Sequence, residues 1–198
     1  MFILFKPLLT TLAATTISIF SLTAQADTQI VNLDAKKNNQ QNPVQLYLRA
    51  GTYQIKPIGR AEGGVNTAWS VWEQTSCKQA RGCPRTVPTQ FTGMHNNYYV
   101  MSAHLGEVNV AGKAIPQVLE TPRDRMHSYY LVNSNARAFE VTQPRVYADD
   151  ASALAGAQSS VFTMTTNGRI QFALLDNSRI SDNRGGMSLQ IIPLNTNH

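Results

Sequence analysis

Short runs of alternating apolar and polar residues, separated by turn-forming residues, constrain the fold of this chain most strongly. In the run 52–58, Tyr53 and Ile55 alternate with Gln54 and Lys56. A period of two places one set of side chains on the buried face of a sheet and the other set in water. Further runs with strand character lie at 44–48, 68–72, 97–102, 107–110, 129–132, 138–142, 160–165, 169–175 and 187–192.

The connections between these runs indicate how the strands follow one another. Asn167-Gly168 predicts a two-residue hairpin between 160–165 and 169–175, because both residue types tolerate the positive φ that a type I′ turn demands. Only 149–156 has a helical pattern, with acids at its start and Gly156 at its end. Many short strands and one brief helix predict an all-β fold, an antiparallel β-sandwich of jelly-roll type.

The first 26 residues have the features of a secretory signal peptide. Lys6 precedes the apolar stretch 8–22, and Ala24-Gln25-Ala26 places small residues three and one before the expected cleavage site. We therefore expect a single mature domain, residues 27–198, that is secreted or periplasmic. No later stretch is long and apolar enough to predict membrane insertion.

Charge and cysteine content narrow the classes of partner and environment. The whole chain has 17 Lys and Arg, so removing Lys6 leaves 16 against 12 Asp and Glu, a net charge of +4. These basic residues are scattered, which argues against nucleic-acid binding. Cys77 and Cys83 are the only cysteines, and in an exported chain we expect them to form a disulfide. Free thiols at a metal site are the alternative, but zinc would need two further ligands.

Oxygen-bearing residues are concentrated in the stretch 176–191. Asp176-Asn177 and Asp182-Asn183 lie six residues apart, and Gly185-Gly186 follows the second pair. Carboxylates, amide oxygens and backbone carbonyls in one loop are the ligands that calcium prefers. The same residue types also form ordinary polar turns, which is the alternative interpretation.

Motifs of common secreted hydrolases are missing from the sequence. It contains neither Gly-x-Ser-x-Gly nor His-Glu-x-x-His. A glycosidase needs two carboxylates across a sugar, for which Glu62 and Glu73 are candidates, but nothing in the sequence fixes their separation. We therefore expect a protein that is not an enzyme, with a glycoside hydrolase as an alternative.

Aromatic residues beside Asn-rich segments suggest a binding surface. Flat rings next to amide and carboxylate groups suit a sugar ring. We expect at least one of Trp69 and Trp72 to be buried, because aromatics in strands often belong to the core. Tyr98 and Tyr99 should face opposite sides of a strand, so that one is accessible. The candidate ligand-binding residues are Glu62, Asn66, Trp72, His95, Asn96 and Tyr98.

Residues 163–191 resemble the C-terminal strand-loop-strand of the LecA-type calcium-dependent galactophilic lectins, small bacterial sandwiches with a galactose-binding-domain-like fold. The matching positions are Asp176, the pair Asp182-Asn183, Gly185, and Ser188-Leu189-Gln190-Ile191. The resemblance implies calcium held by the side chains of Asp176, Asp182 and Asn183 and by the carbonyl of Ile180.

Upstream, residues 51–69 look like the opening strand and first site loop of the same family. In that family a backbone carbonyl of the loop also reaches the ion, which implies Gly64 as a further ligand. Residues 113–150 look like an insertion, and the chain has no counterpart to the His-x-x-Gln element that contacts galactose in the family.

Together these observations predict a secreted, non-catalytic, calcium-dependent protein that binds carbohydrate or glycoconjugates. A secreted factor directed at a host or envelope protein, with calcium in a structural role, is the alternative of a different class. The glycoside hydrolase is the third hypothesis.

Overall fold

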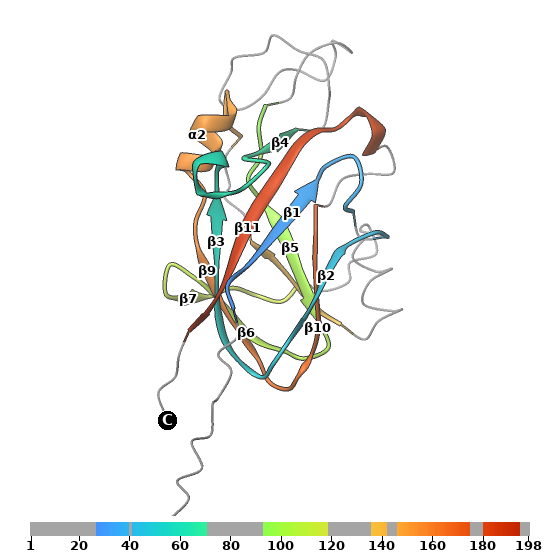
Figure 1. The fold of residues 1–198 in the computed structure, drawn as a ribbon, viewed down its shortest axis with the longest axis vertical. Helices are drawn as coiled ribbons and strands as arrows, with labels where there is room; N and C mark the ends of the chain where they lie inside the picture. Colours follow the sequence, from blue (N-terminus) through green and yellow to red (C-terminus); the bar gives the residue numbers. More distant parts are fainter. Residues whose placement is uncertain are drawn as a thin grey trace, which may run out of the picture.

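The structure, a computed structural model, describes residues 27–39, 41–70, 93–118, 136–141, 146–174 and 180–194. Within these residues the chain forms two antiparallel sheets that pack face to face, which confirms the predicted all-β sandwich (Figure 1). None of the helices in this part of the chain is long and apolar enough to cross a membrane. The predicted signal peptide, residues 1–26, and the predicted disulfide of Cys77 and Cys83 lie outside the described residues.

The larger sheet has the strand order β1-β11-β3-β9-β6-β7, and β4 pairs with the start of β11. The smaller sheet has the order β2-β10-β5-β8. The strands of the larger sheet are β1 (Gln29–Asp34), β3 (Gly51–Ile58), β4 (Trp69–Ser70), β6 (Leu105–Val110), β7 (Lys113–Ala114), β9 (Ser160–Met164) and β11 (Arg184–Leu194). Those of the smaller sheet are β2 (Val44–Leu48), β5 (Tyr98–Ser102), β8 (Arg137–Val141) and β10 (Gly168–Ala173).

The core lies between the sheets and follows the period of two that the sequence shows. Tyr53 and Ile55 of β3 are buried, while Gln54 and Lys56 are only partly buried. From the opposite sheet, Phe172 of β10 joins the same cluster. Burying a large aliphatic or aromatic side chain contributes about 1.5–3 kcal/mol, so this cluster is the main source of stability.

The aromatic predictions have mixed outcomes. Trp69 belongs to the core, as expected for at least one tryptophan. The expectation that either Tyr98 or Tyr99 is accessible is wrong, because both are buried. The two rings do face opposite sides of β5, but Tyr99 packs in a second cluster with Met101 and Ala138. Both faces of this strand are therefore covered.

The predicted helix is confirmed as α2 (Asp150–Ala155). Asp149 caps it, since the Asp149 carboxylate accepts the N–H of Ser152 at 2.7 Å. This bond lowers the pKa of Asp149. Two 3₁₀ turns, η1 (Arg60–Glu62) and η2 (Ile180–Asp182), precede β4 and β11.

The predicted Asn167-Gly168 hairpin is wrong. β9 pairs with β3 and β6 in the larger sheet, whereas β10 pairs with β2 and β5 in the smaller one. The turn therefore carries the chain from one sheet to the other. Neither Asn167 nor Gly168 has a positive φ, so the type I′ geometry is not used.

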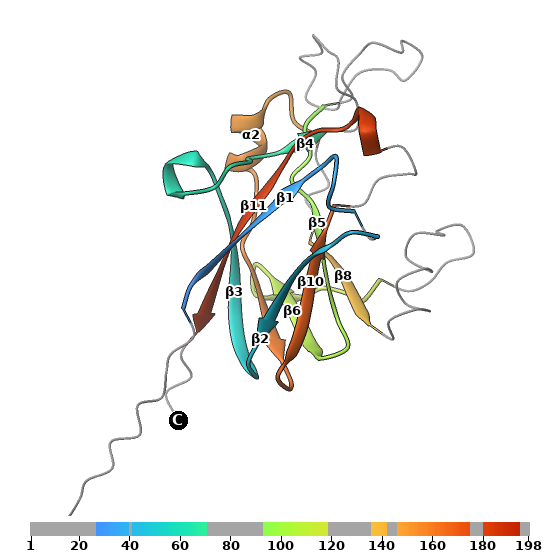
Figure 2. The same ribbon diagram turned by 45° about the vertical axis from the view of Figure 1, so that its right-hand side comes forward.

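Three connections between the sheets lie together at one end of the sandwich, which we call the crossover end (Figure 2). They are 49–50 between β2 and β3, 103–104 between β5 and β6, and 165–167 between β9 and β10.

Hydrogen bonds and close packing join these connections to one another. The Asn167 side-chain oxygen accepts the N–H of Ala50 at 2.7 Å. The His104 carbonyl accepts the N–H and the hydroxyl of Thr165, at 2.8 and 3.0 Å. A Cβ on Gly168 would lie 2.1 Å from the His104 ring. Asn167 and Gly168 thus make contacts between the connections and do not form a hairpin.

A double-mutant cycle tests this role of Gly168. We expect Gly168→Ala to lower the free energy of unfolding by about 1–3 kcal/mol, because the new methyl overlaps the His104 ring. In a His104→Ala background, Gly168→Ala should leave the free energy of unfolding almost unchanged. Urea denaturation of the four proteins measures both values. An equal cost in both backgrounds would mean that backbone conformation, not the ring, requires glycine.

Residues 113–150, predicted as an insertion, contain elements that belong to the sandwich. β7 pairs with the end of β6, and β8 pairs along its length with β5. The described part of this segment therefore completes the edges of both sheets. Whether it is inserted relative to the lectin family stays a prediction.

Candidate functional site

The end of the sandwich opposite the crossover end contains β4, α2, η1 and η2, and we call it the β4 end (Figure 1). Here the larger sheet is extended by further backbone hydrogen bonds. The N–H of Ala35 donates to the Gly185 carbonyl at 3.0 Å, and the N–H of Gly186 donates to the Ala68 carbonyl at 2.9 Å. Trp69 and His95 then exchange two backbone hydrogen bonds of 3.0 and 2.7 Å. Segments distant in sequence thereby meet around the start of β11.

Several predicted site residues lie outside the described part of the chain. They are Asp176, Trp72, Cys77, Cys83 and Glu73. Asp182 is the last residue of η2, and its side chain is not among those described. Their roles stay predictions.

Asn183, predicted as a metal ligand, has an unusual environment. It is only 1% exposed, and its amide nitrogen donates to the Ala35 carbonyl at 3.0 Å. This bond fixes the orientation of the amide, because only the nitrogen can donate to a carbonyl. The side-chain oxygen is buried and has no hydrogen-bond partner among the described residues. Leaving such an oxygen without a partner costs about 1–3 kcal/mol, which a cation or a donor would recover.

Asn183 directly follows η2, and a backbone hydrogen bond joins it to the first residue of that turn. The N–H of Asn183 donates to the Ile180 carbonyl at 3.3 Å. A carbonyl oxygen has two lone pairs, so the oxygen of Ile180 can still bind a second group. The predicted carbonyl ligand and the predicted amide ligand are therefore joined by one turn.

The loop after η1, residues 63–66, lies directly on β11. A Cβ on Gly64 would lie 2.7 Å from the Ser188 Cβ, so only glycine fits this contact. The Ser188 hydroxyl accepts the N–H groups of Val65 and Asn66, at 3.0 and 2.9 Å. It also lies 2.6 Å from the side-chain oxygen of Asn32, to which it donates. Gly64 and Asn66, both predicted site residues, are held on β11, the strand that begins directly after Asn183.

Asn66 is bound a second time through its side chain. Its amide nitrogen donates to the Leu33 carbonyl at 3.0 Å. Asn66 and Asn183 thus bind carbonyls two residues apart on the same segment, Leu33 and Ala35. Asn32 and Ser188, which fix the loop, were not among the predicted site residues. Nothing local in the sequence distinguishes them from other outward-facing polar residues of strands.

Replacing Ser188 tests how strongly this loop is held. We expect Ser188→Ala to lower the free energy of unfolding by about 1–3 kcal/mol, because it removes three hydrogen bonds: the Asn66 N–H loses this partner, and the Val65 N–H keeps only the Asn32 side-chain oxygen, at 3.3 Å. Ser181→Ala, at an exposed position of η2, is the matched control and should change it by less than about 0.5 kcal/mol. Thermal unfolding followed by circular dichroism measures both. Equal stabilities would contradict the anchoring role of Ser188.

Glu62 and His95 retain access to solvent. Glu62 is exposed and pairs with Lys56 at 2.6 Å, and this hydrogen bond lowers the pKa of its carboxyl. The His95 ring lies 5.0 Å from the Trp69 ring at an angle of 35°. Burial lowers the pKa of His95, so at neutral pH its ring is uncharged and one nitrogen can accept a hydrogen bond.

Asn96 and Tyr98, predicted as ligand-binding residues, are both buried. The Tyr98 hydroxyl lies 3.1 Å from that of Ser160, and burial raises its pKa. The Asn96 nitrogen donates to the Ala153 carbonyl of α2 at 3.0 Å, while its side-chain oxygen has no partner in the described part of the chain. As placed, these two side chains contribute to the interior rather than to a surface.

Acidic and imidazole groups do not form a metal centre by themselves in the described residues. No three His, Cys, Asp or Glu side chains of this part of the chain lie close enough together to hold an ion. From the described residues alone, a calcium site at the β4 end would therefore need amide and carbonyl oxygens.

Comparisons with known proteins identify no relative. The chain matches no protein-family model, no curated protein and no solved structure.

Proposed function

We propose that this protein is an exported, calcium-dependent carbohydrate-binding protein whose site lies at the β4 end of the sandwich. The observation that supports it is the buried side-chain oxygen of Asn183, for which the described part of the chain supplies no hydrogen-bond partner. This residue was predicted as a calcium ligand from the sequence pattern. Within the described residues no group donates to its side-chain oxygen, a feature that it shares with Asn96, and the sequence pattern selects Asn183 as the ligand.

The residues that would hold the ion combine three kinds of oxygen. Asn183 supplies an amide oxygen, Asp176 and Asp182 supply carboxylates, and Ile180 and Gly64 supply carbonyls. Calcium takes six to eight oxygens, so this set leaves positions for sugar hydroxyls or water. When bound, the ion would supply positive charge that orients hydroxyl groups.

The loop of residues 62–66 is the proposed contact for the sugar. Glu62 is exposed, Asn66 is partly exposed, and the Ser188 contacts hold the loop beside the start of β11. A carboxylate and an amide can together accept from and donate to vicinal hydroxyls. His95 supplies a partly exposed neutral ring at the same end.

Calcium binding can be measured directly by isothermal titration calorimetry. We expect Asn183→Ala and Asp176→Ala each to weaken calcium binding by at least about 100-fold, more than the loss typical of groups that only support a ligand. Asn109→Ala, an asparagine of β6, is the control and should leave the affinity unchanged. Unaltered affinity in both site variants, or no binding by the wild type, would contradict the proposed ion site.

A glycan array with calcium and with a chelator tests the carbohydrate. We expect signals that need calcium, and we expect Glu62→Gln to weaken them about tenfold, as for the loss of a hydrogen bond to a charged group. Glu107→Gln, which replaces an exposed acid of β6, should leave the glycan signals unchanged. Calcium binding by every variant but no glycan signal from any would instead support a structural ion in a protein that binds another protein.

A further inference from the structure

Residues 115–118, which we call the bridging segment, connect the two sheets near their edges. The N–H of Ile115 donates to the Val108 carbonyl of β6 at 2.9 Å. The N–H of Val118 donates to the Ala138 carbonyl of β8 at 2.8 Å. β6 belongs to the larger sheet and β8 to the smaller. The bridging segment is therefore fixed at both ends across the side of the sandwich.

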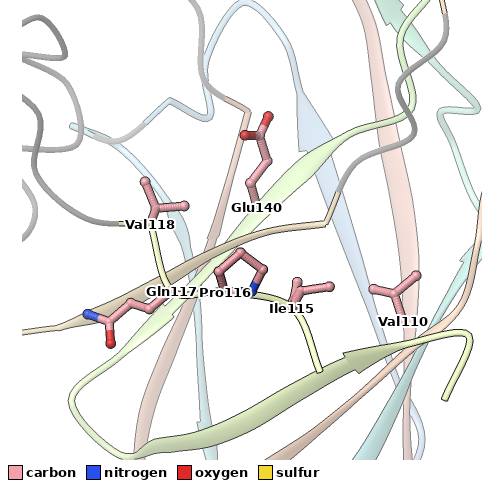
Figure 3. A pocket seen from close by; sticks show the side chains of 6 residues that line it. All are labelled: Val110, Ile115, Pro116, Gln117, Val118 and Glu140. Carbon is pink, nitrogen blue, oxygen red and sulfur yellow. The ribbon is translucent and has the colours of Figure 1, made fainter. Parts of the chain in front are cut away.

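A cavity of about 300 Å³ lies against this segment. In Figure 3 the side chains of Val118, Pro116, Ile115 and Val110 follow one another along one line, and Glu140 lies beside them on β8. The volume is about twice that of an engineered apolar cavity that binds benzene, and it is at the lower limit for ligand pockets. The size suits a molecule of one or two rings.

In Figure 3 the side chain of Glu140 runs from β8 away from Pro116 and Ile115, so its negative charge lies at the rim of the apolar cavity. One of its oxygens accepts the side-chain N–H of Asn97 at 3.1 Å. Asn97 is itself fixed, because its carbonyl accepts the Trp69 indole N–H at 3.0 Å. Among the described residues no Lys, Arg or His forms an ion pair with Glu140. The structure records no described residue as a partner of its second oxygen.

Arg137, the basic residue of β8, is engaged elsewhere. One of its nitrogens donates to the carbonyls of Leu105 and Gly106, both at 2.6 Å, and its guanidinium lies over the Phe139 ring. Another nitrogen donates to the side-chain oxygen of Gln117 at 3.2 Å. Arg137 therefore binds the bridging segment through Gln117 and forms no recorded ion pair with Glu140 within the described residues.

We propose that this cavity binds a small organic ammonium ion with an apolar body of one or two rings. The ammonium group donates to Glu140, and the body displaces water from the aliphatic walls and Pro116. A neutral ligand of the same shape would leave the carboxylate without a cation in a partly desolvated place. The site uses none of the residues proposed for calcium and sugar.

Titration with 2-phenylethylammonium and with 2-phenylethanol tests the proposal. Methyl NMR spectra in calcium-free buffer at pH 7 should show shifts of Val110, Ile115 and Val118 for the amine. The amine should bind about tenfold more tightly than the alcohol, the effect expected of a hydrogen bond to a charged group. Absence of these shifts up to about 10 mM amine, or equal affinity for both ligands, would overturn the proposal.

A pair of variants separates the charge of Glu140 from its shape. Glu140→Gln keeps an oxygen that can accept from Asn97, so the fold should be retained, and its affinity for the amine should fall to that for the alcohol. Glu107→Gln removes an exposed acid of β6 and should leave the amine affinity unchanged. Amine binding by Glu140→Gln at the wild-type affinity would overturn the proposal. The ratio of the wild-type affinities for the amine and the alcohol tests the proposal even if Glu140→Gln does not fold.

Discussion

The two-residue alternation along β11 is the constraint on which the core and the candidate site both depend. Met187, Leu189 and Ile191 face the core, so Ser188 faces the other side, where it anchors the loop 63–66. β11 also pairs with both β1 and β3. A slip of one residue would expose the apolar set and bury the polar one, so the register is strongly fixed. The position of the candidate site is therefore set by the same energetics as the core.

The strands could be predicted from the sequence because their signal is local. Tyr53 and Ile55 alternate with polar residues, and burial of alternate side chains follows directly. Strand pairing could not be predicted in the same way. Asn167-Gly168 has the composition of a hairpin, yet its contacts are with Ala50 and His104, which are distant in the sequence. Such residues satisfy long-range packing that no short window contains.

The candidate site shows the same division between local pattern and tertiary contact. The spacing of oxygen-bearing residues pointed to Asn183, and the structure gives that residue a buried oxygen with no partner from the residues described. Residue type alone also pointed to Asn96 and Tyr98, which the fold buries. Conversely, Asn32 and Ser188 fix the loop but have no distinctive sequence signal. Burial and hydrogen-bond partners decide these roles, and both depend on segments that folding brings together.

The central claim is that a cation completes the coordination of Asn183 at the β4 end. A crystal structure of the full mature chain grown with calcium tests it most directly. The account predicts an ion with the Asn183 side-chain oxygen about 2.3–2.6 Å away, among six to eight oxygen ligands. A structure in saturating calcium with no ion there, and with that oxygen bonded to water or an N–H group, would contradict it.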